Sequence, residues 1–587
     1  MMLLSLSFRS AVLCFYMALF LLPVSAQDKE SDAIRLNQVG FYPHGIKRAV
    51  VVGEKPGSFT VMSAAGKKVF TGKLTGPRTS PFSSKKTFVA DFSAVSAPGV
   101  YTVVVPGAGH SYSFVIGRNV HDGVERAAIK AFYYQRVSAA LPEKYAGRWL
   151  RPAGHADDSV IVHPSAATPK HPAGSVIRAP KGWYDAGDYN KYIVNSGITM
   201  GTLLSAYEDF TSYYDTLKLA IPERGNAVPD VLDETLWNLR WMLTMQDETG
   251  GVYHKLTNAG FDGMVMPERA TKRRYVVQQG TAATLDFAAV MAQASRILKR
   301  FNTSVPGLAD SCLAASQRAW QWAVAHPDVA YDQDAMNKQF DPDVSTGGYG
   351  DRNFTDEFIW AAAELYATTH DDAYYTAVTM IPDEAMPLPS WGQVRLLGYY
   401  TLLRTRKQLP GHQPDVATLE KRLISYADKL IAGVDARSYM TVMGGSAGDF
   451  IWGSSSVAAN QGIVLIQAYN LTHNAKYLGY ALSNLDYILG RNGTGYSFVT
   501  SYGSRTPMHP HHRPSEADGI EEPVPGFLVG GPNPGMQDKC SYASSVADEA
   551  YTDDVCSYAS NEVAINWNAP LVYLAGALEA LQSVWEK

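Results

Sequence analysis

The sequence has few cysteines, and none of them lies in a metal-binding pattern. Four occur in 587 residues, with no Cys-X-X-Cys pair and no cysteine–histidine cluster of zinc-binding spacing. A structural zinc site is therefore not expected. Cys540 and Cys556 can pair in an oxidising compartment, which would leave Cys312 as a buried thiol. Three unpaired buried thiols fit the spacing equally well, so both arrangements stay open.

Strong charge of one sign is also missing. The net charge is -5 and no long basic run is present, so a nucleic-acid partner is not expected. Apolar residues make up 46% and charged residues 18% of the chain, which is ordinary for a globular protein with a large core. Aromatic residues are abundant instead, with 34 Tyr and 11 Trp. Such rings stack on sugars, although most of them pack inside proteins.

Long apolar runs are absent beyond the N-terminus, where none approaches the ~18 residues of a membrane-spanning helix. The apolar run at 11–23 is short, follows Arg9, and precedes a small-residue cleavage pattern at 24–26. We therefore expect residues 1–26 to be a signal peptide. The mature protein is predicted to be exported, periplasmic or extracellular, with no membrane span.

The mature chain has two parts with different sequence patterns. Residues 32–117 contain seven short alternating or β-branched runs between Gly, Pro and Ser turns, which predicts a small all-β immunoglobulin-like sandwich. Residues 120–587 contain eleven segments with apolar residues at helical spacing and no clear linker, which predicts one helical barrel or toroid. Long loops at 151–181, 331–355 and 496–551 are rich in Gly, Pro and Asp, and we expect them to build the functional face.

The first candidate site is the stretch GWYDAGDYNKY at 182–192. Asp185 and Asp188 are separated by the small residues Ala186 and Gly187, so a tight turn would aim both carboxylates at one point. Two such acids can hold a water molecule and take a proton from it. An Asx-turn is the alternative interpretation. The surrounding aromatics favour a site, and we expect one of them, Trp183, to contact a substrate.

The second candidate is YTDDVCSYASNEVAINWNA at 551–569, where Glu562 is expected to open the last long helix. A helix start favours an ionised carboxylate, whereas nearby aromatics raise its pKa. Alone, Glu562 would be a first-turn acid that complements the helix dipole. Together with the aspartate pair, it completes the set that inverting glycoside hydrolysis needs, in which one carboxylate activates water and one carboxylic acid protonates the leaving oxygen.

The third candidate is the loop YSFVTSYGSRTPMHPHHRPS at 496–515, with three His and two Arg within nine residues. Its spacing matches no zinc arrangement. His511 and Arg513 suit hydrogen bonding to sugar hydroxyls or to a carboxylate. A solvated loop without a specific role is the alternative.

These three stretches, in this order and after an IRLNQVGFYP opening, resemble glycoside hydrolase family 9, the endoglucanase family, in its subgroup with an N-terminal immunoglobulin-like domain. The resemblance covers nearly all of the mature chain. It implies a mainly α fold, an (α/α)6 barrel preceded by the β-sandwich. It also implies hydrolysis of β-1,4-glucan links with inversion at the anomeric carbon.

The resemblance implies a role for each matching residue. Asp188 would be the general base, Asp185 its partner in holding water, and Glu562 the general acid. His511 and Arg513 would bind the sugar at the cleavage point. The remaining expected residues are Asp553 as a supporting acid in the catalytic set, and Tyr558, Trp452 and Trp183 as substrate contacts.

Some members of the family bind calcium near the start of a barrel helix. The corresponding stretch DRNFTDEFIW carries Asp351, Asp356 and Glu357, and such oxygen ligands suit calcium. Helix capping explains them as well, and the acid expected after a later Trp is missing because Gly392 follows Trp391. We expect no required cofactor, with Asp356 and Glu357 as candidate ligands of a structural calcium.

The sequence thus predicts an exported monomeric endo-β-1,4-glucanase that acts on a β-glucan polysaccharide or oligosaccharide of cellulose, mixed-linkage or xyloglucan type. An exo-acting β-glucosidase or glucosaminidase on the same scaffold is the first alternative. A non-catalytic glycan-binding protein is the second, but binding alone does not need three placed acids. A polysaccharide lyase would need cations for a uronate, and this loop offers only Arg505 and Arg513.

Overall fold

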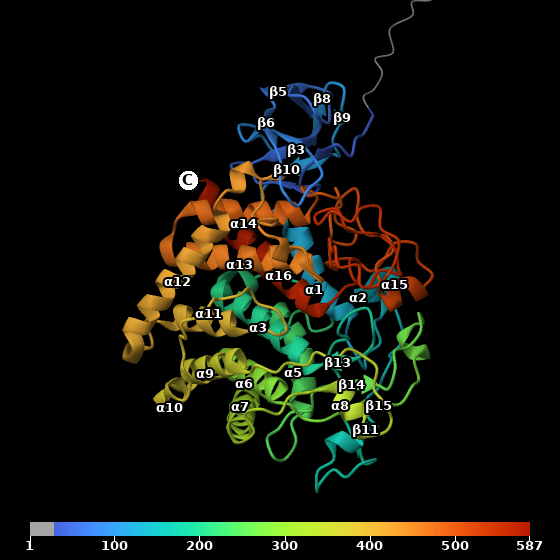
Figure 1. Ribbon diagram of the computed structural model, residues 1–587, viewed down its shortest axis with the longest axis vertical. Helices are drawn as coiled ribbons and strands as arrows, with labels where there is room; N and C mark the ends of the chain where they lie inside the picture. Colours follow the sequence, from blue (N-terminus) through green and yellow to red (C-terminus); the bar gives the residue numbers. More distant parts are fainter. Residues whose placement is uncertain (1–28, 587) are drawn as a thin grey trace, which may run out of the picture.

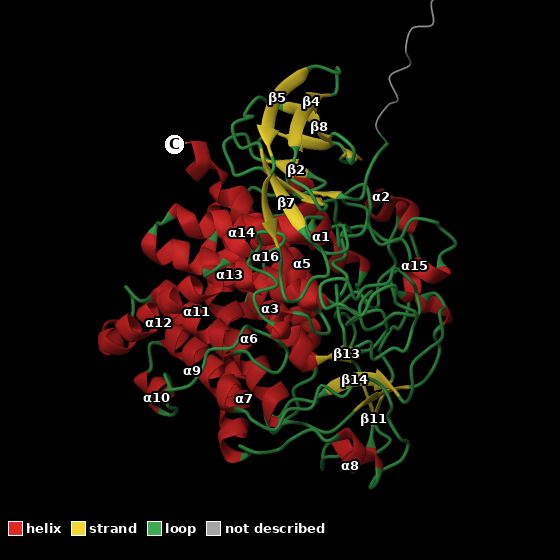
Figure 2. Cartoon of the chain, turned by 45° about the horizontal axis from the view of Figure 1, so that its top comes forward, coloured by secondary structure: helices red, strands yellow, loops and turns green. Residues whose placement is uncertain are grey.

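The computed structural model describes residues 29–586, in which a small β-domain sits on one side of a large helical domain (Figures 1 and 2). Within this range no helix is both long and apolar enough to cross a membrane. The predicted signal peptide at 1–26 lies outside the described residues.

The N-terminal domain consists of two packed sheets with a core of their own. That core contains Phe41, Phe59, Phe88 and Phe114, and it is separate from the core of the helical domain. The first sheet has the order β1 (Ile34–Arg35), β3 (Arg48–Val52), β7 (Thr87–Asp91) and β6 (Thr75–Arg78). The second has the order β2 (Gly40–Phe41), β10 (Phe114–Ile116), β8 (Gly99–Val105), β4 (Ser58–Ser63) and β5 (Lys68–Lys73), with β9 (Gly109–His110) paired to β8.

Seven predicted runs correspond to ten strands, and the differences have local causes. The missed strand β6 reads TGPR, and Gly and Pro are depleted in strands and tolerated mainly at sheet edges, where β6 lies. The first predicted run splits into β1 and β2 because Asn37 and Gln38 between them turn toward the helical domain. Asn37 Nδ2 donates to Asp486 Oδ1 at 2.9 Å, and Gln38 Nε2 donates to the Gly495 carbonyl at 2.8 Å.

The helical domain is an (α/α)6 barrel, in which all eleven predicted helical segments form helices. The inner ring consists of α3 (Ile193–Asp209), α6 (Thr281–Leu298), α9 (Thr355–Thr369), α11 (Arg395–Thr405), α13 (Ser454–Thr472) and α16 (Ile565–Leu581). The outer ring consists of α1 (Asp122–Tyr134), α5 (Asp230–Thr244), α7 (Leu308–Ala325), α10 (Asp372–Thr376), α12 (Gln413–Ile431) and α14 (Ala475–Ile488). Short helices α2 (Glu143–Ala146), α4 (Thr211–Tyr214), α8 (Gln333–Asn337) and α15 (Arg513–Ala517) lie in the connections.

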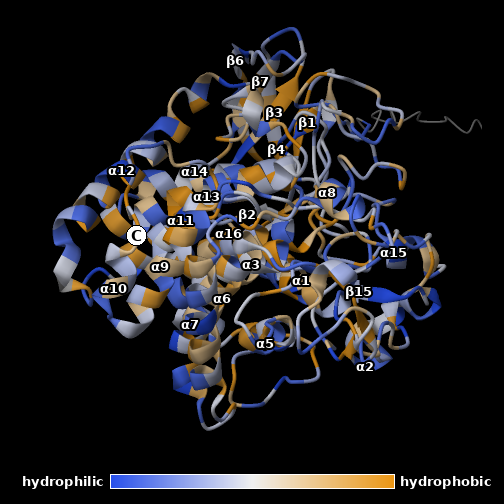
Figure 3. Ribbon diagram, turned by 60° about the horizontal axis from the view of Figure 1, so that its bottom comes forward, coloured by the Kyte–Doolittle hydropathy of each residue, from blue (hydrophilic) through white to orange (hydrophobic). Residues whose placement is uncertain are grey.

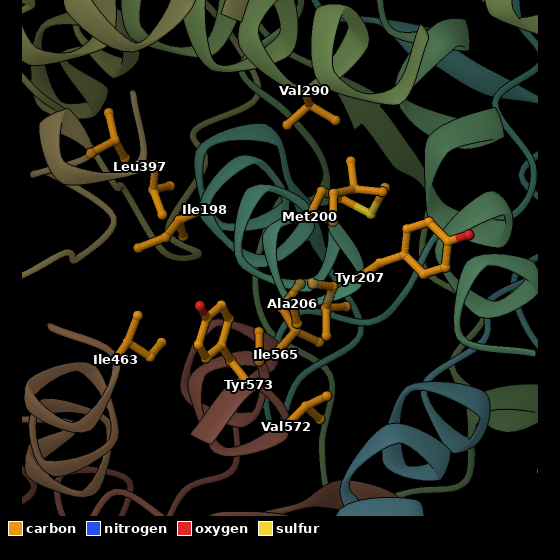
Figure 4. Close-up of a cluster of buried hydrophobic side chains, with 14 of the residues drawn as sticks. Ile198, Met200, Ala206, Tyr207, Val290, Leu397, Ile463, Ile565, Val572 and Tyr573 are labelled. Atoms are coloured by element: carbon orange, nitrogen blue, oxygen red, sulfur yellow. The ribbon is translucent and has the colours of Figure 1, made fainter. Parts of the chain in front are cut away.

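The helices of the two rings differ in how much of their surface is buried. Inner helix α6 buries 17 of its 18 residues, whereas outer helix α12 buries only Val416, Leu419, Leu423 and Ala427, one apolar stripe at helical spacing. Figure 3 shows the alternation of hydrophilic and hydrophobic residues along α12. Side chains from the inner helices meet in the barrel core, as Figure 4 shows for α3, α6, α11, α13 and α16.

A third sheet was not predicted. It has the order β12 (Val176–Ile177), β11 (Val160–Val162), β15 (Arg274–Val276), β14 (Lys255–Asn258) and β13 (Lys191–Tyr192). Its strands have two to four residues, too few for a period-2 pattern to emerge, and two of them lie within the predicted 151–181 loop. This sheet matters for the site because β13 directly precedes α3 and follows the aspartate loop.

The long loops precede inner helices and therefore gather at one end of the barrel. The aspartate loop leads through β13 into α3, the 331–355 loop into α9, and the 496–564 segment into α16. Because the inner helices of such a barrel run parallel, their N-terminal ends share one face. The predicted functional face is the face that these loops build.

Candidate active site

The aspartate loop is tied both to itself and to the C-terminal helix. The Asp185 N–H donates to the Asn190 carbonyl at 3.0 Å, which closes the loop. The Asp185 carbonyl accepts from the N–H of Ile565, the first residue of α16, at 2.8 Å. Asp185 and Asp188 are 1% and 5% exposed, so both acids are held in a rigid, mostly dry setting.

Asp185 is surrounded by donors but keeps a raised pKa. Asn195 Nδ2 lies 2.9 and 3.1 Å from its two oxygens, and the Tyr349 hydroxyl donates to Oδ2 at 3.0 Å. Burial and the neighbouring Asp188 charge nevertheless raise the pKa of Asp185 to about 8. At neutral pH most of its population is therefore protonated.

Asp188 is bonded on one side only. Asn190 Nδ2 and the Tyr192 hydroxyl, the latter at 3.2 Å, both donate to Oδ2. Within the described residues, both hydrogen bonds of this carboxylate go to Oδ2 and none goes to Oδ1. A carboxylate fixed through one oxygen, with the other free, can accept a proton from a water molecule.

Gly187 connects three parts of the site. Its N–H donates to Glu562 Oε1 at 3.3 Å, and its carbonyl accepts from the Arg513 N–H at 3.1 Å and from Arg513 Nη1 at 2.8 Å. A Cβ atom at Gly187 would lie 2.0 Å from the His511 carbonyl oxygen. The backbones approach so closely that only glycine fits here.

Glu562 does not open the last helix, which corrects the sequence prediction. Helix α16 begins at Ile565, and Glu562 lies before it in an isolated parallel bridge with His511. Burial and the charges of Asp188 and Asp185 raise its pKa well above the usual range, and Arg513 and the Gly187 N–H oppose this only in part. Because Glu562 lies outside the first helical turn, the helix dipole does not hold it ionised. The environment of Glu562 thus favours its protonated form.

His511 is fixed as a neutral ring. Its backbone N–H donates to the Asn561 carbonyl at 2.9 Å, and its ring Nδ1 lies 2.6 Å from the Val555 carbonyl oxygen. A carbonyl only accepts, so Nδ1 carries the proton and Nε2 is the acceptor. Burial, followed by the Arg513 charge, lowers the pKa of His511, although the Val555 contact opposes this. The free Nε2 can accept a hydrogen bond from a hydroxyl.

Two predicted residues hold the histidine loop from within the protein. Asp553 accepts from the N–H groups of Met508 at 2.9 Å and His509 at 2.9 Å, and from Asn561 Nδ2 at 3.1 Å. Arg513, 6% exposed, donates through Nε to the Asp262 carbonyl at 3.0 Å in addition to its bonds to Gly187. Both side chains therefore shape the site, and much of their hydrogen-bonding capacity is used for that.

Trp452 and Tyr558 form an aromatic surface beside His511. Trp452 is 41% exposed, and its ring lies 5.3 Å from that of Tyr558 with a tilt of 34°. The Tyr558 ring lies 6.0 Å from the His511 ring, and its hydroxyl donates to the Gln537 carbonyl at 3.0 Å. Flat rings in such a row offer stacking faces to sugar units.

The expectation that Trp183 contacts a substrate is wrong. Its side chain is 0% exposed, its Nε1 donates to Glu234 Oε1 at 3.0 Å, and its ring packs 4.7 Å from Phe132. Trp183 belongs to the core beneath the aspartate loop, where Glu234 satisfies its N–H and Phe132 packs against its ring.

Tyr349 is the main site residue that sequence reasoning missed. It enters from the loop before α9, bonds Asp185 and packs edge-on against Trp391 with ring centroids 5.4 Å apart. The signal was the GGYG sequence in the 331–355 loop, where two glycines flank an aromatic. Asn190 and Asn195 were missed as well, since nothing in sequence marks which amides face a carboxylate.

The predicted calcium ligands lie at the start of α9. Asp356 and Glu357 are each 1% exposed, and Asp286 of α6 is buried close by. Asp356 Oδ2 already accepts from the Val394 N–H at 2.7 Å. Across residues 29–586, no group of three or more His, Cys, Asp or Glu side chains is arranged to hold a metal ion. Calcium binding at Asp356 and Glu357 therefore stays a prediction, testable by thermal unfolding with and without the ion.

The cysteines adopt the first of the two arrangements left open. Cys540 and Cys556 form a disulfide, and Cys312 is a buried free thiol in α7. The disulfide ties the segment before the acid signature to the turn that carries Val555 and Tyr558.

Comparisons with known proteins agree with this geometry. The family model described as "Glycosyl hydrolase family 9" matches residues 122–575. The chain belongs to glycosyl hydrolase family 9. It is a glycoside hydrolase of the endoglucanase family, and the model described as "Cellulase N-terminal ig-like domain" matches residues 29–110.

Individual relatives of this family 9 hydrolase span almost its whole length. The "Xyloglucan-specific endo-beta-1,4-glucanase BoGH9A" of Bacteroides ovatus is 47% identical over 555 residues, 94% of each chain. "Endoglucanase D" of Acetivibrio thermocellus is 34% identical over 92% of this chain and 83% of that protein. A solved structure titled "Bacteroides ovatus GH9" superposes with a TM-score of 0.88 at 46% identity, covering 94% of this chain and 99% of the other.

Proposed function

We propose that this family 9 hydrolase cuts internal β-1,4-glucosidic links of a glucan with inversion, using Asp188 as general base and Glu562 as general acid. The proposal rests on one observation, which is that Asp188 and Glu562, on either side of Gly187, have different environments. Among the described residues, both hydrogen bonds of the Asp188 carboxylate go to Oδ2, which leaves Oδ1 free, and the pKa of Glu562 is raised well above its usual range. Inversion requires one ionised and one protonated carboxyl group on opposite sides of the bond.

In the proposed reaction, a water molecule binds to Asp188 Oδ1 and attacks the anomeric carbon. Its proton passes to Asp188 while Glu562 gives its proton to the leaving glycosidic oxygen, so the two protons balance. Asp185, mostly protonated and held by Asn195 and Tyr349, donates to the same water.

Sugar binding falls to the neutral His511 ring and to the aromatic surface. His511 Nε2 accepts from a sugar hydroxyl at the cleavage point, and Trp452 and Tyr558 stack on neighbouring units. Arg513 acts mainly by keeping the Gly187 carbonyl in place.

As substrate we propose a β-1,4-glucan of the branched xyloglucan type. The name of the Bacteroides ovatus relative, at 47% identity, supports this class. Linear cellulose is the second candidate, because Endoglucanase D is also similar over most of the chain. We further propose that the protein is exported and monomeric, which gel filtration of the secreted enzyme would check.

Asp188→Asn and Glu562→Gln test the proposal on a panel of xyloglucan, mixed-linkage glucan, cellulose and chitosan. Each variant should keep its melting temperature but lose about 10²–10⁴-fold in kcat on the preferred polymer. Glu516→Gln, an exposed acid on α15, is the matched control and should keep wild-type rates. Wild-type turnover in either active-site variant would contradict the assignment, and chain-end products alone would favour an exo-acting enzyme.

A further inference from the structure

A fully buried lysine lies behind the aspartate loop without a carboxylate partner. Lys255, the first residue of β14, is 0% exposed. Its Nζ donates to Gln333 Oε1 at 2.7 Å, Thr346 Oγ1 at 3.0 Å and the Gly347 carbonyl at 2.6 Å. In the described part of the chain it forms no ion pair. A buried ammonium with three neutral acceptors is costly, which points to a purpose other than pairing.

A chain of hydrogen bonds leads from this ammonium to the proposed base. Because the ammonium can only donate, the Thr346 hydroxyl is left to donate onward to Thr257 Oγ1, 2.6 Å away. The Thr257 hydroxyl has two acceptors within reach, the Asn258 carbonyl at 2.8 Å and Asn190 Oδ1 at 3.0 Å, and Asn190 Oδ1 also accepts from the Asn258 N–H at 2.9 Å. With its oxygen so occupied, the Asn190 amide must turn its Nδ2 toward Asp188.

A second branch reaches both aspartates through the loop that Lys255 holds. The Gly347 N–H donates to the Tyr192 hydroxyl at 3.2 Å, and that hydroxyl donates to Asp188 Oδ2. Two residues further along, Tyr349 bonds Asp185. Lys255 thus fixes the backbone from which Tyr349 extends, and its ammonium lies 5.5 Å from the Tyr192 ring centre.

We propose that Lys255 is a positioning residue for the hydrolytic reaction, which orients Asn190, Tyr192 and Tyr349 onto the aspartate pair and places a positive charge behind Asp188. The inference rests on the proposed role of Asp188 as base. Lys255 is fully buried, so it acts through these side chains.

The pH dependence of the proposed effect follows from the charged groups around Asp188. The charged and titratable groups that face Asp188 from the packed elements are Asp185, Tyr192, Lys255, Asp262, Tyr349, His511 and Glu562. Burial lowers the pKa of Lys255 to about 7, and the charge of Asp188 opposes this. On the acid side of the pH profile, the proposed base Asp188 must be ionised to work. Lys255 is protonated there, and its positive charge favours the ionised form of Asp188.

Lys255→Met tests the proposal, with Lys191→Met as a matched control. Lys191 is an equally buried lysine on the neighbouring strand β13, but its Nζ pairs with Asp157 at 2.7 Å. We expect Lys255→Met to lower kcat by about 10²-fold with little change in KM. It should also move the acid limb of kcat/KM up by about one pH unit. Lys191→Met should lower the melting temperature without moving that limb.

Thr257→Val removes the hydroxyl that links Thr346 to Asn190 but leaves the positive charge of Lys255 in place. It should therefore lower kcat without shifting the acid limb of the pH profile. This variant keeps the proposal testable if Lys255→Met does not fold. An unchanged acid limb in Lys255→Met, or wild-type kcat in Thr257→Val, would overturn the inference. Wild-type turnover in Asp188→Asn would instead refute the proposed base, so the two failures are distinguishable.

Discussion

At the scale of single residues, proton placement decides the chemistry. Two carboxyl groups near each other cannot both stay ionised in a dry site, and here Asp188 has the donors that stabilise a charge while Glu562 has few. The sequence identified both acids, and the family resemblance implied which is the base and which the acid, but the residues alone did not show what would keep Glu562 protonated. Burial and neighbouring charges depend on chain segments hundreds of residues apart, and no local pattern encodes them.

The raised pKa of Glu562 predicts the alkaline limb of activity. The protonated form is the active one, so kcat/KM falls as the pH rises through the pKa of Glu562, which lies well above the usual value of 4.5. The pH profile of kcat/KM on a soluble glucan measures this limb. In Glu562→Gln the residual activity should lack it. An enzyme that has lost its activity by about pH 5 would contradict the prediction.

Gly187 makes the sharpest steric prediction. In Gly187→Ala the new Cβ would meet the His511 carbonyl oxygen at 2.0 Å, so the loop must shift away from Glu562 and Arg513. A displacement of this size should cost about 10²-fold in kcat/KM. Gly263→Ala is the control, because nothing lies within 4 Å of its added Cβ. Equal kinetics in the two variants would show that the Gly187 contact does not matter.

At the scale of elements, long periodic segments were predictable and short ones were not. Each of the eleven apolar periodicities formed a helix because a stripe or an entire surface is buried along its length. Helix α16 begins at Ile565, three residues later than expected, because Glu562 first pairs its backbone with the His511 segment. The five-strand sheet that includes Lys255 escaped prediction, since tertiary contacts rather than propensity stabilise strands of two to four residues.

The Cys540–Cys556 disulfide braces the element that carries the sugar-binding surface. Cys540→Ser with Cys556→Ser opens a loop closed across 16 residues, at a cost of about 3 kcal/mol. Val555, which holds His511, and Tyr558 lie beside Cys556, so KM should rise more than kcat falls. Calorimetry and steady-state kinetics measure the two effects, and thiol reduction of the wild type should reproduce them. Unchanged KM and melting temperature would contradict this role.

At the scale of the whole molecule, the site exists only because distant segments converge. Asp185, Tyr349, Trp452 and Glu562 each precede a different inner helix, and the barrel brings their loops to one end. The two domains and the order of the signatures were readable from sequence. The contact between Asn37 and Asp486, 449 residues apart, was not, because one buried amide on a short strand connection has no sequence signature.

The N-terminal domain also contacts the segment that leads to the histidine loop. Gln38 Oε1 accepts from the N–H groups of Ser504 at 2.9 Å and Arg505 at 2.8 Å. Arg505 in turn pairs with Asp32 at 2.8 Å. The β-domain therefore supports the approach to His511 from outside the barrel.

The central claim is that Asp188 activates a water while Glu562 protonates the leaving oxygen, and the anomeric form of the first product tests it most directly. Proton NMR during the first minutes of hydrolysis of a β-1,4-glucan should show the α-anomer before mutarotation, because water attacks opposite the leaving group. Glu562→Gln, followed over the same time, should show almost no product. A β-anomer that appears first from the wild-type enzyme would contradict the account.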